Sequence, residues 1–257
     1  MARPKESSIV SKCALIMDTL GSARQPLPFS EIVARTGFVK SSCHRILAVL
    51  QSEQMIEYDS DSRTYFTGSR LQNWAPSSLD RHGVQEAAAP IMDALSMRAR
   101  MNAALSALET DCILYLRTSD YVSLRFAARA GDRAPLHCTA AGKMFLAAME
   151  ARRRAELLAL LKLEAFTEFT KTNPDELEAE LESVAAQGFA VAVREEYLHV
   201  VGVCAPIRNG QSQVIAGLSL WAQTDDATPA ELMAQAPDII KAAEEISRRM
   251  GWRGDIR

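Results

Sequence analysis

Apolar residues recur with a helical period in the first 52 positions of the chain. In residues 9–20 they return every three or four positions, and Gly21 ends that stretch. A second predicted helix begins at Ser30, which we expect to serve as its N-cap, and ends at Gly37, where a positive φ is permitted. A third begins near Lys40. Two short helices joined by a glycine turn are typical of a helix-turn-helix.

The helix from Lys40 has one apolar stripe and one cationic outer face. The stripe, at i, i+3, i+4 and i+7, consists of Cys43, Ile46, Leu47 and Leu50. No acidic residue lies between Glu31 and Glu53. Arginine can bind the O6 and N7 atoms of guanine, and hydroxyl groups can bind phosphates or base edges. We therefore expect a DNA-binding surface formed by Arg35, Lys40, Ser41, Ser42, His44 and Arg45.

A predicted hairpin follows this helix pair directly. Its strands are residues 55–58 and 65–67, and the turn between them carries Arg63, which we add to the DNA-binding surface. A helix-turn-helix followed by a hairpin is the winged form of the motif. Winged helices also serve as protein-interaction modules that never touch DNA, and this alternative stays open.

Three stretches of the chain resemble the IclR family of bacterial transcriptional regulators. They are SEIVARTGFVKSSCHRILAVLQSEQMIE, GDRAPLHCTAAGKMFLAAM and GFAVAVREEYLHVVGVCAPIRNGQSQVIAGLSLW, and the resemblance covers nearly the whole chain. It implies an all-α, winged helix-turn-helix head followed by a GAF-like effector domain. It also implies a ligand-responsive regulator that binds a double-stranded DNA operator as a homodimer or homotetramer.

The pattern after residue 83 predicts an α+β domain with a central antiparallel sheet. Expected strands alternate with helices and are bounded by turn residues; they lie at 103–108, 112–117, 122–127, 189–194, 200–207 and 214–221. Thr139 and Asn173 are expected helix caps, and Pro237 is expected to start a new helical segment within 229–250. We place the head at 1–75, a linker at 76–83 and the effector domain at 84–257.

The resemblance also implies a ligand pocket between the sheet and the helix after Thr139. The matching positions are Arg125, Phe126, Ala140, Ala141, Gly142, Ala192, Gly202, Ser219 and Trp221. The small residues at the helix start leave N–H groups free for an anion. Family members that bind very small keto acids can carry an acidic residue at the position of Ala192. They can also carry a cysteine at the position of Gly202 and a serine at the position of Trp221. We therefore expect a less polar pocket here, for a small organic acid with a flat or aromatic body held against Phe126 and Trp221.

Composition and charge limit the classes of partner that each part of the protein can bind. The net charge of the 257 residues is −3, but it is unevenly distributed. Residues 1–75 carry nine Lys/Arg and seven Asp/Glu, whereas residues 76–257 carry 20 Lys/Arg and 25 Asp/Glu. Only the head is suited to nucleic acid, and its weak positive charge favours a dimer that presents two heads. No apolar run is long enough for a membrane span or a signal peptide, so we expect a cytoplasmic protein.

Neither a metal nor a cofactor is expected. The five cysteines and four histidines are scattered without metal-ligand spacing, and Gly142-Lys143 is followed by Met144, which excludes a phosphate loop. The remaining alternative is a hydrolase with Cys138 or Ser219 as nucleophile and His137 or His199 as base. No orienting third residue is visible for either, so no catalytic residue is assigned.

Overall fold

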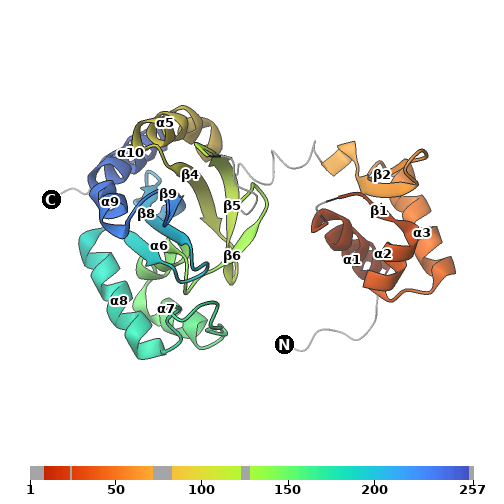
Figure 1. Cartoon of the computed structure of the whole chain (residues 1–257), viewed down its shortest axis with the longest axis horizontal. Helices are drawn as coiled ribbons and strands as arrows, with labels where there is room; N and C mark the ends of the chain where they lie inside the picture. The colour runs from red at the N-terminus through yellow and green to blue at the C-terminus, as the bar shows by residue number, and fades with distance from the viewer. Residues whose placement is uncertain (1–8, 24, 72–82, 123–127, 255–257) are drawn as a thin grey trace. The chain divides into compact units, whose positions relative to one another are not determined.

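The computed structural model describes residues 9–23, 25–71, 83–122 and 128–254. The chain divides into two compact units, Met1–Arg81 and His82–Arg257, each with its own hydrophobic core (Figure 1). Within the described ranges no helix has the length and apolar character needed to cross a membrane.

The smaller unit is a winged helix-turn-helix, as the sequence predicted. Its elements in chain order are α1 (Ile9–Gly21), β1 (Leu27–Pro28), α2 (Phe29–Thr36), α3 (Lys40–Ser52), β2 (Ile56–Asp59) and β3 (Thr64–Thr67). The strands form an antiparallel sheet in the order β1-β3-β2. The apolar stripe of α3 is buried, and its four members are at most 2% exposed. They pack with α1 and α2 into one core.

The start of α2 differs from the prediction. Pro28 occupies the N-cap position with an extended backbone, and Ser30 lies inside the first turn without capping the helix. The difference arises because Pro28 also pairs with Thr64 in the sheet, which fixes where the extended chain ends. Gly37 ends the helix with φ of 67°, as expected, and its N–H donates to the carbonyl of Val33.

The larger unit is built on one six-stranded antiparallel sheet, with strand order β6-β5-β4-β9-β8-β7. Its strands are β4 (Asn102–Leu108), β5 (Cys112–Ser119), β6 (Arg133–Pro135), β7 (Ala190–Val193), β8 (Val200–Arg208) and β9 (Val214–Gln223). Its helices are α5 (Val84–Ala99), α6 (Ala140–Ala147), α7 (Ala151–Leu158), α8 (Pro174–Gln187), α9 (Pro229–Ala234) and α10 (Ala236–Arg249).

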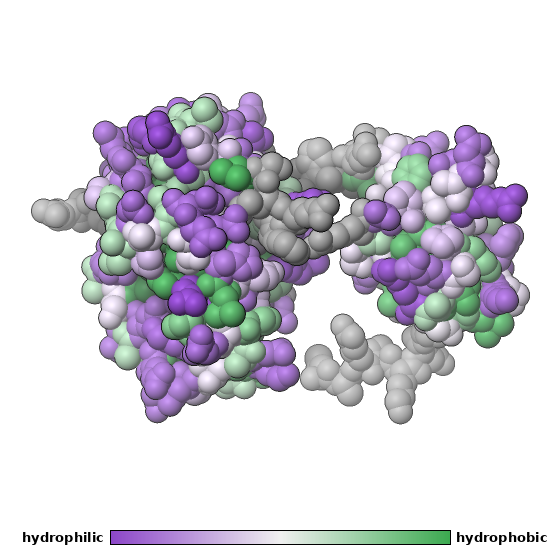
Figure 2. Space-filling model, viewed as in Figure 1, coloured by the Kyte–Doolittle hydropathy of each residue, from purple (hydrophilic) through white to green (hydrophobic). Residues whose placement is uncertain are grey.

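Helices cover both faces of this sheet (Figure 1). Helices α5 and α10 pack on one face, and α6 packs on the other, where α8 lies against it. Hydrophilic residues cover most of the visible surface of both units, interrupted by a hydrophobic patch near the middle of the larger one (Figure 2). The antiparallel sheet flanked by helices confirms the predicted architecture of the effector domain.

Local helix signals were read correctly at three places in this unit. The Thr139 side chain accepts a hydrogen bond from Gly142 N at 3.0 Å, Asn173 caps α8, and Pro237 lies in the first turn of α10. Two expectations differ. Residues 133–135, which lie in none of the expected strands, form edge strand β6 because they pair with β5. The strand expected at 122–127 falls almost entirely outside the described residues.

Candidate functional site

The outer face of α3 carries the polar residues that the sequence placed there. Lys40, Ser41, His44 and Arg45 are exposed, and Ser42 is half-buried beside them. The four buried residues of the stripe fix the rotation of the helix about its axis. The exposed donors are therefore held on the side away from the core, which is the side that a recognition helix presents to a groove.

Two of the predicted DNA-binding residues, Arg35 and His44, contact neighbouring side chains. The guanidinium of Arg35 forms an exposed ion pair with Glu31, one turn earlier on α2. The His44 ring packs edge-on against Phe29, with ring centroids 6.1 Å apart. Arg63 lies at the tip of the wing with φ of 55°, in an exposed turn. Glu53, at the end of α3, pairs with Arg70. The acids that bracket the cationic stretch are thus both paired with arginine.

The larger unit contains a cavity of about 90 Å³ between α6, the sheet and the β7–β8 loop. A buried water needs about 10–15 Å³ on the same measure, so the space admits several waters or one small organic molecule. Its lining residues are Tyr115, Ala128, Cys138, Thr139, Ala140, Ala141, Ala192, Glu195, Glu196, Tyr197, Val200, Gly202, Ser219, Leu220 and Trp221. Six of the nine positions expected to bind a ligand are among them.

The α6 side of the cavity offers two free N–H groups. Ala140 and Ala141 are the first residues of α6, and no described residue accepts a hydrogen bond from their backbone nitrogens. Gly142 does not belong to this set, contrary to expectation. Its N–H already donates to Thr139 Oγ1, and a Cβ on it would lie 2.3 Å from the carbonyl oxygen of Leu136. Gly142 is therefore required for close backbone packing, outside the lining.

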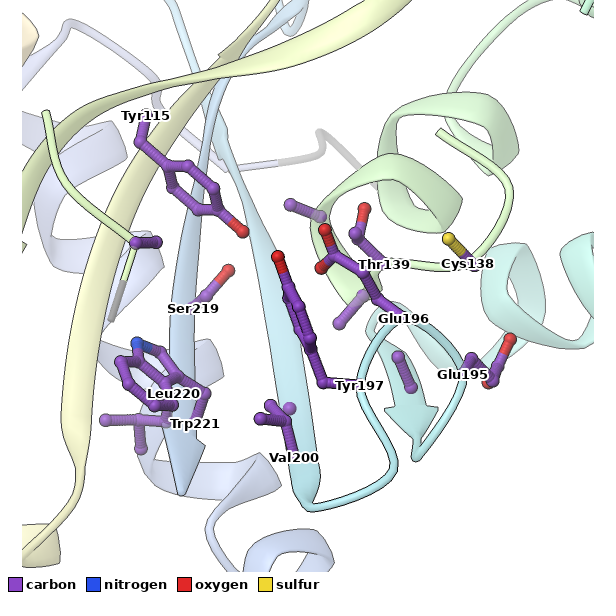
Figure 3. A pocket seen from close by; sticks show the side chains of 15 residues that line it. Tyr115, Cys138, Thr139, Glu195, Glu196, Tyr197, Val200, Ser219, Leu220 and Trp221 are labelled. Carbon is purple, nitrogen blue, oxygen red and sulfur yellow. The ribbon is translucent and has the colours of Figure 1, made fainter. Parts of the chain in front are cut away.

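The opposite side of the cavity is polar, which the sequence interpretation missed. The hydroxyl groups of Tyr115, Tyr197 and Ser219 and the carboxyl group of Glu196 face the same space (Figure 3). The Ser219 hydroxyl is buried and reaches no oxygen or nitrogen partner among the described residues. The indole nitrogen of Trp221 is buried and lacks a partner in the same part of the chain. The expectation that this pocket is less polar than those of family members that bind very small keto acids stays a prediction.

Burial sets the protonation of this polar side. It raises the pKa of Glu196 to about 7, and no described cation or hydrogen-bond donor offsets the effect. Burial also raises the pKa of Tyr115 well above its usual value, so this phenol stays neutral. At neutral pH the Tyr115 phenol is therefore neutral, and the pH is close to the pKa of the Glu196 carboxyl group.

A buried ion network supports the cavity from behind. The Lys143 side chain on α6 is fully buried, and its Nζ lies 2.6 Å from Glu195 Oε1 and 2.8 Å from Glu180 Oε1. Lys171 Nζ approaches the other oxygen of Glu180 at 2.7 Å. In Figure 3 the Glu195 carboxyl group points away from the carboxyl group of Glu196. The network therefore ties the β7–β8 loop to α6 and α8 and leaves Glu196 to face the cavity.

The remaining predicted positions divide into two groups. Ala192 and Gly202 face each other across β7 and β8, and Trp221 is the partner of Gly202 on β9, so the strand register brings three distant segments to one wall. Arg125 and Phe126 lie outside the described residues. Of the residues that were missed, Glu195 and Glu196 resembled an ordinary charged turn, and no local pattern in the sequence distinguishes them from one.

The cavity lacks the arrangement of a hydrolase. Burial raises the pKa of the Cys138 thiol far above its usual value, which keeps it protonated and poorly nucleophilic. His137 Nε2 lies 2.9 Å from the carbonyl oxygen of Glu164, so this ring nitrogen already has a hydrogen-bond partner. All five cysteines are free thiols, and in the described part of the chain no cluster of three or more His, Cys, Asp or Glu could hold a metal ion.

Comparison with known families covers both units. Residues 10–60 match the IclR helix-turn-helix domain, and residues 76–248 match the family described as bacterial transcriptional regulator IclR C-terminal. The chain belongs to the IclR family of transcriptional regulators. It is 31% identical over 232 residues to the probable transcriptional regulator SauR of Cupriavidus necator, which covers 90% of this chain and 92% of that protein.

Other IclR-family proteins agree in sequence and in fold. The regulator BhcR of Paracoccus denitrificans is 29% identical, covering 89% of this chain and 82% of that protein. The crystal structure of Thermotoga maritima IclR aligns with a TM-score of 0.78 at 24% identity, covering 95% of this chain and 98% of that one. An IclR homologue from Microbacterium hydrocarbonoxydans, complexed with 4-hydroxybenzoate, aligns with a TM-score of 0.81 at 24% identity. The alignment covers 95% of this chain and 99% of that one. The curated relatives are named transcriptional regulators, so this chain is a regulator and not a hydrolase.

Proposed function

We propose that this IclR-family regulator reads its operator through the outer face of α3. The observation that supports this most directly is the exposed cluster of Lys40, Ser41 and Arg45 on a helix whose opposite face is fully buried. Arg45 is placed to reach a base edge, and Lys40 at the helix start to contact a phosphate. The protein acts as a dimer or tetramer, because two heads must bind half-sites about 34 Å or a multiple of that apart.

Fluorescence anisotropy tests this proposal. The purified protein is titrated with duplex DNA from its own upstream region and with scrambled DNA, at two salt concentrations. Arg45→Ala should abolish the preference for the specific duplex, and Lys40→Ala should weaken binding to both and lower the salt slope by about one. Arg153→Ala, an equal loss of charge on exposed α7, is the matched control and should change neither. No binding to either duplex at low salt would favour a protein-interaction module.

We further propose that the cavity binds a small organic acid with a flat, hydroxyl-bearing body. The free N–H groups of Ala140 and Ala141 suit a carboxylate at the start of α6. The indole of Trp221 and the rings of Tyr115 and Tyr197 suit a flat body, and the hydroxyl groups beside Glu196 suit a polar substituent. The 4-hydroxybenzoate bound to the Microbacterium homologue has this chemistry, which makes hydroxybenzoates the first candidates.

Titration calorimetry with a panel of acids tests the effector. The panel is 4-hydroxybenzoate, 3-hydroxybenzoate, benzoate, cyclohexanecarboxylate and pyruvate, and we expect the hydroxybenzoates to bind most tightly. Ser219→Ala should weaken them, because its hydroxyl group lines the cavity and has no oxygen or nitrogen partner among the described residues. Ser106→Ala is the matched control, a buried serine of the same sheet whose hydroxyl group bonds to the carbonyl of Gly217. Flat responses to every acid would refute this class of effector.

A further inference from the structure

Val39 is an exposed apolar residue at the start of the recognition helix. It occupies the N-cap position of α3 and is 74% exposed, the highest value for any large apolar side chain in the described part of the smaller unit. In Figure 2 hydrophobic surface lies at the lower right of that unit, the end at which α3 begins in Figure 1. The neighbouring Lys40 and Ser41 are exposed as well. An apolar group therefore lies within the surface proposed to face DNA.

The backbone directs this side chain outward and holds it there. Val39 has φ −61° and ψ 136°, and its carbonyl oxygen accepts the first hydrogen bond of α3, from Cys43 N at 3.0 Å. The preceding residue, Phe38, packs against the core, and consecutive side chains of an extended backbone point in opposite directions. Valine is also restricted at χ1 by its branched Cβ. The two methyl groups are therefore presented to solvent with little freedom to turn inward.

Helix stability does not explain a valine at this position. Serine, threonine, asparagine and aspartate are strongly preferred as N-caps, and valine is among the poorest. The structure shows no side-chain cap at the start of α3. The fold gains no apolar burial in exchange, because the side chain is mostly in water. A role in contact with a partner accounts for the residue better than a role in folding does.

We propose that Val39 is a specificity-determining residue that contacts the C5-methyl group of a thymine in the major groove. The inference rests on the proposed DNA-binding function of α3. Among the four bases only thymine presents a methyl group in that groove, and apolar side chains read it by direct contact. The amino-terminal residues of a recognition helix are those that reach base edges, which is where Val39 lies. Each half-site should therefore contain one thymine that this residue requires.

Replacing thymidine by deoxyuridine tests the contact, because it removes only the methyl group. A binding duplex is first selected from a random library by the purified full-length protein. Each thymidine of a half-site is then replaced in turn, and affinity is measured by fluorescence anisotropy. One replacement per half-site should weaken the wild-type protein about four-fold, the effect expected from losing the burial of one methyl group. Val39→Ala, which removes two methyl groups from the side chain and leaves it shorter, should show a smaller penalty for deoxyuridine than the wild type.

Lys40→Ala is the matched control for the effect of Val39→Ala on the deoxyuridine penalty. It should bind every duplex more weakly, yet keep the same penalty for deoxyuridine as the wild type, because a phosphate contact carries no information about the methyl group. Wild-type protein that is insensitive to deoxyuridine at every position, or Val39→Ala with the full penalty, would overturn the inference while leaving DNA binding intact. If the library yields no selective duplex, the DNA-binding proposal itself fails, and this inference fails with it.

Discussion

The ammonium nitrogen of Lys143 lies 2.6 Å from Glu195 Oε1, and both side chains are buried. Burial raises the pKa of Glu195, while the charge of Lys143 opposes that shift. For Glu180, burial also acts to raise the pKa, but Lys143 and Lys171 outweigh it and the pKa lies below its usual value. The buried ammonium group of Lys143 therefore contacts two carboxyl groups behind the cavity wall, and Lys171 shares one of them, Glu180.

Lys143→Met should destabilise the larger unit by about 3–5 kcal/mol, because it leaves Glu195 as a buried charge without a partner. The measurement is urea unfolding followed by circular dichroism. Lys143→Met combined with Glu195→Gln should recover part of the loss, since the second change removes the stranded charge. Lys162→Ala is the control: this lysine is 86% exposed in its ion pair with Glu164, and its loss should cost under about 1 kcal/mol. Equal effects of Lys143→Met and Lys162→Ala would contradict the role given to the network.

Gly142→Ala should prevent or strongly impair folding of the larger unit. The added Cβ would lie 2.3 Å from Leu136 O and 2.4 Å from Leu136 Cα, and backbone atoms cannot move aside as a flexible side chain can. Overpacking of a core typically costs about 1–3 kcal/mol, and we expect about 3 kcal/mol or more here. Gly21→Ala, where a Cβ would meet nothing within 4 Å, should be neutral or stabilising. Thermal unfolding of the two variants compares them directly, and a Gly142→Ala protein as stable as the wild type would refute this packing role.

Binding of a carboxylate effector should weaken as the pH rises through about 7. Glu196 has its pKa raised to about 7 by burial, so above that pH it becomes a second anion beside the ligand. Below that pH the Glu196 carboxyl group is already protonated when the effector binds. Near that pH the protein takes up a proton as the effector binds, because the ligand's negative charge favours the protonated form of Glu196. Calorimetry in buffers with different ionisation enthalpies measures that proton directly. Glu196→Gln should bind with little pH dependence, and a wild type that is equally flat from pH 6 to 8 would contradict the effect.

The same carboxyl group should make folding less favourable at high pH. An acid whose pKa is raised in the folded state contributes no penalty below its unfolded pKa, and its penalty grows until the pH passes the folded pKa. One pKa unit corresponds to about 1.4 kcal/mol, and partial solvent access of Glu196 reduces the effect. Glu196→Gln should therefore stabilise the protein by about 1–2 kcal/mol at pH 8 and by very little at pH 4.5. Urea unfolding at the two pH values gives the comparison; an equal gain at both would exclude a titrating carboxyl group as its cause.

Helix periodicity and capping were predictable because both are encoded within one or two turns of chain. The buried stripe of α3 and the caps at Thr139 and Asn173 follow from neighbouring residues alone. The N-cap of α2 was misassigned because Pro28 is fixed by a strand pairing with Thr64, 36 positions away. Local preference at Ser30 carries no information about that pairing.

The polar side of the cavity was not predictable for the same reason. Lys143 and Glu195 are separated by 52 positions and meet only after the sheet has formed. Glu196 and Tyr197 follow in a turn that resembles solvated surface, and their position over α6 depends on how β7 and β8 pair. The family resemblance supplied the sheet side of the site, including Gly202, Ser219 and Trp221. It did not supply the titrating group, which belongs to this chain's own loop.

The strand order of the larger unit also bears on how the protein is made. Strand β4 pairs with β9, so Asn102 meets Trp221 at the centre of the sheet only after more than a hundred intervening residues have been synthesised. Closing so long a loop is slow compared with the local contacts of the winged unit. Domains generally fold as units during synthesis, the amino-terminal one first. On the ribosome the DNA-binding head should therefore be complete while the effector domain still lacks its central strand, and a nascent chain stalled before residue 214 should present a folded head without a sensor.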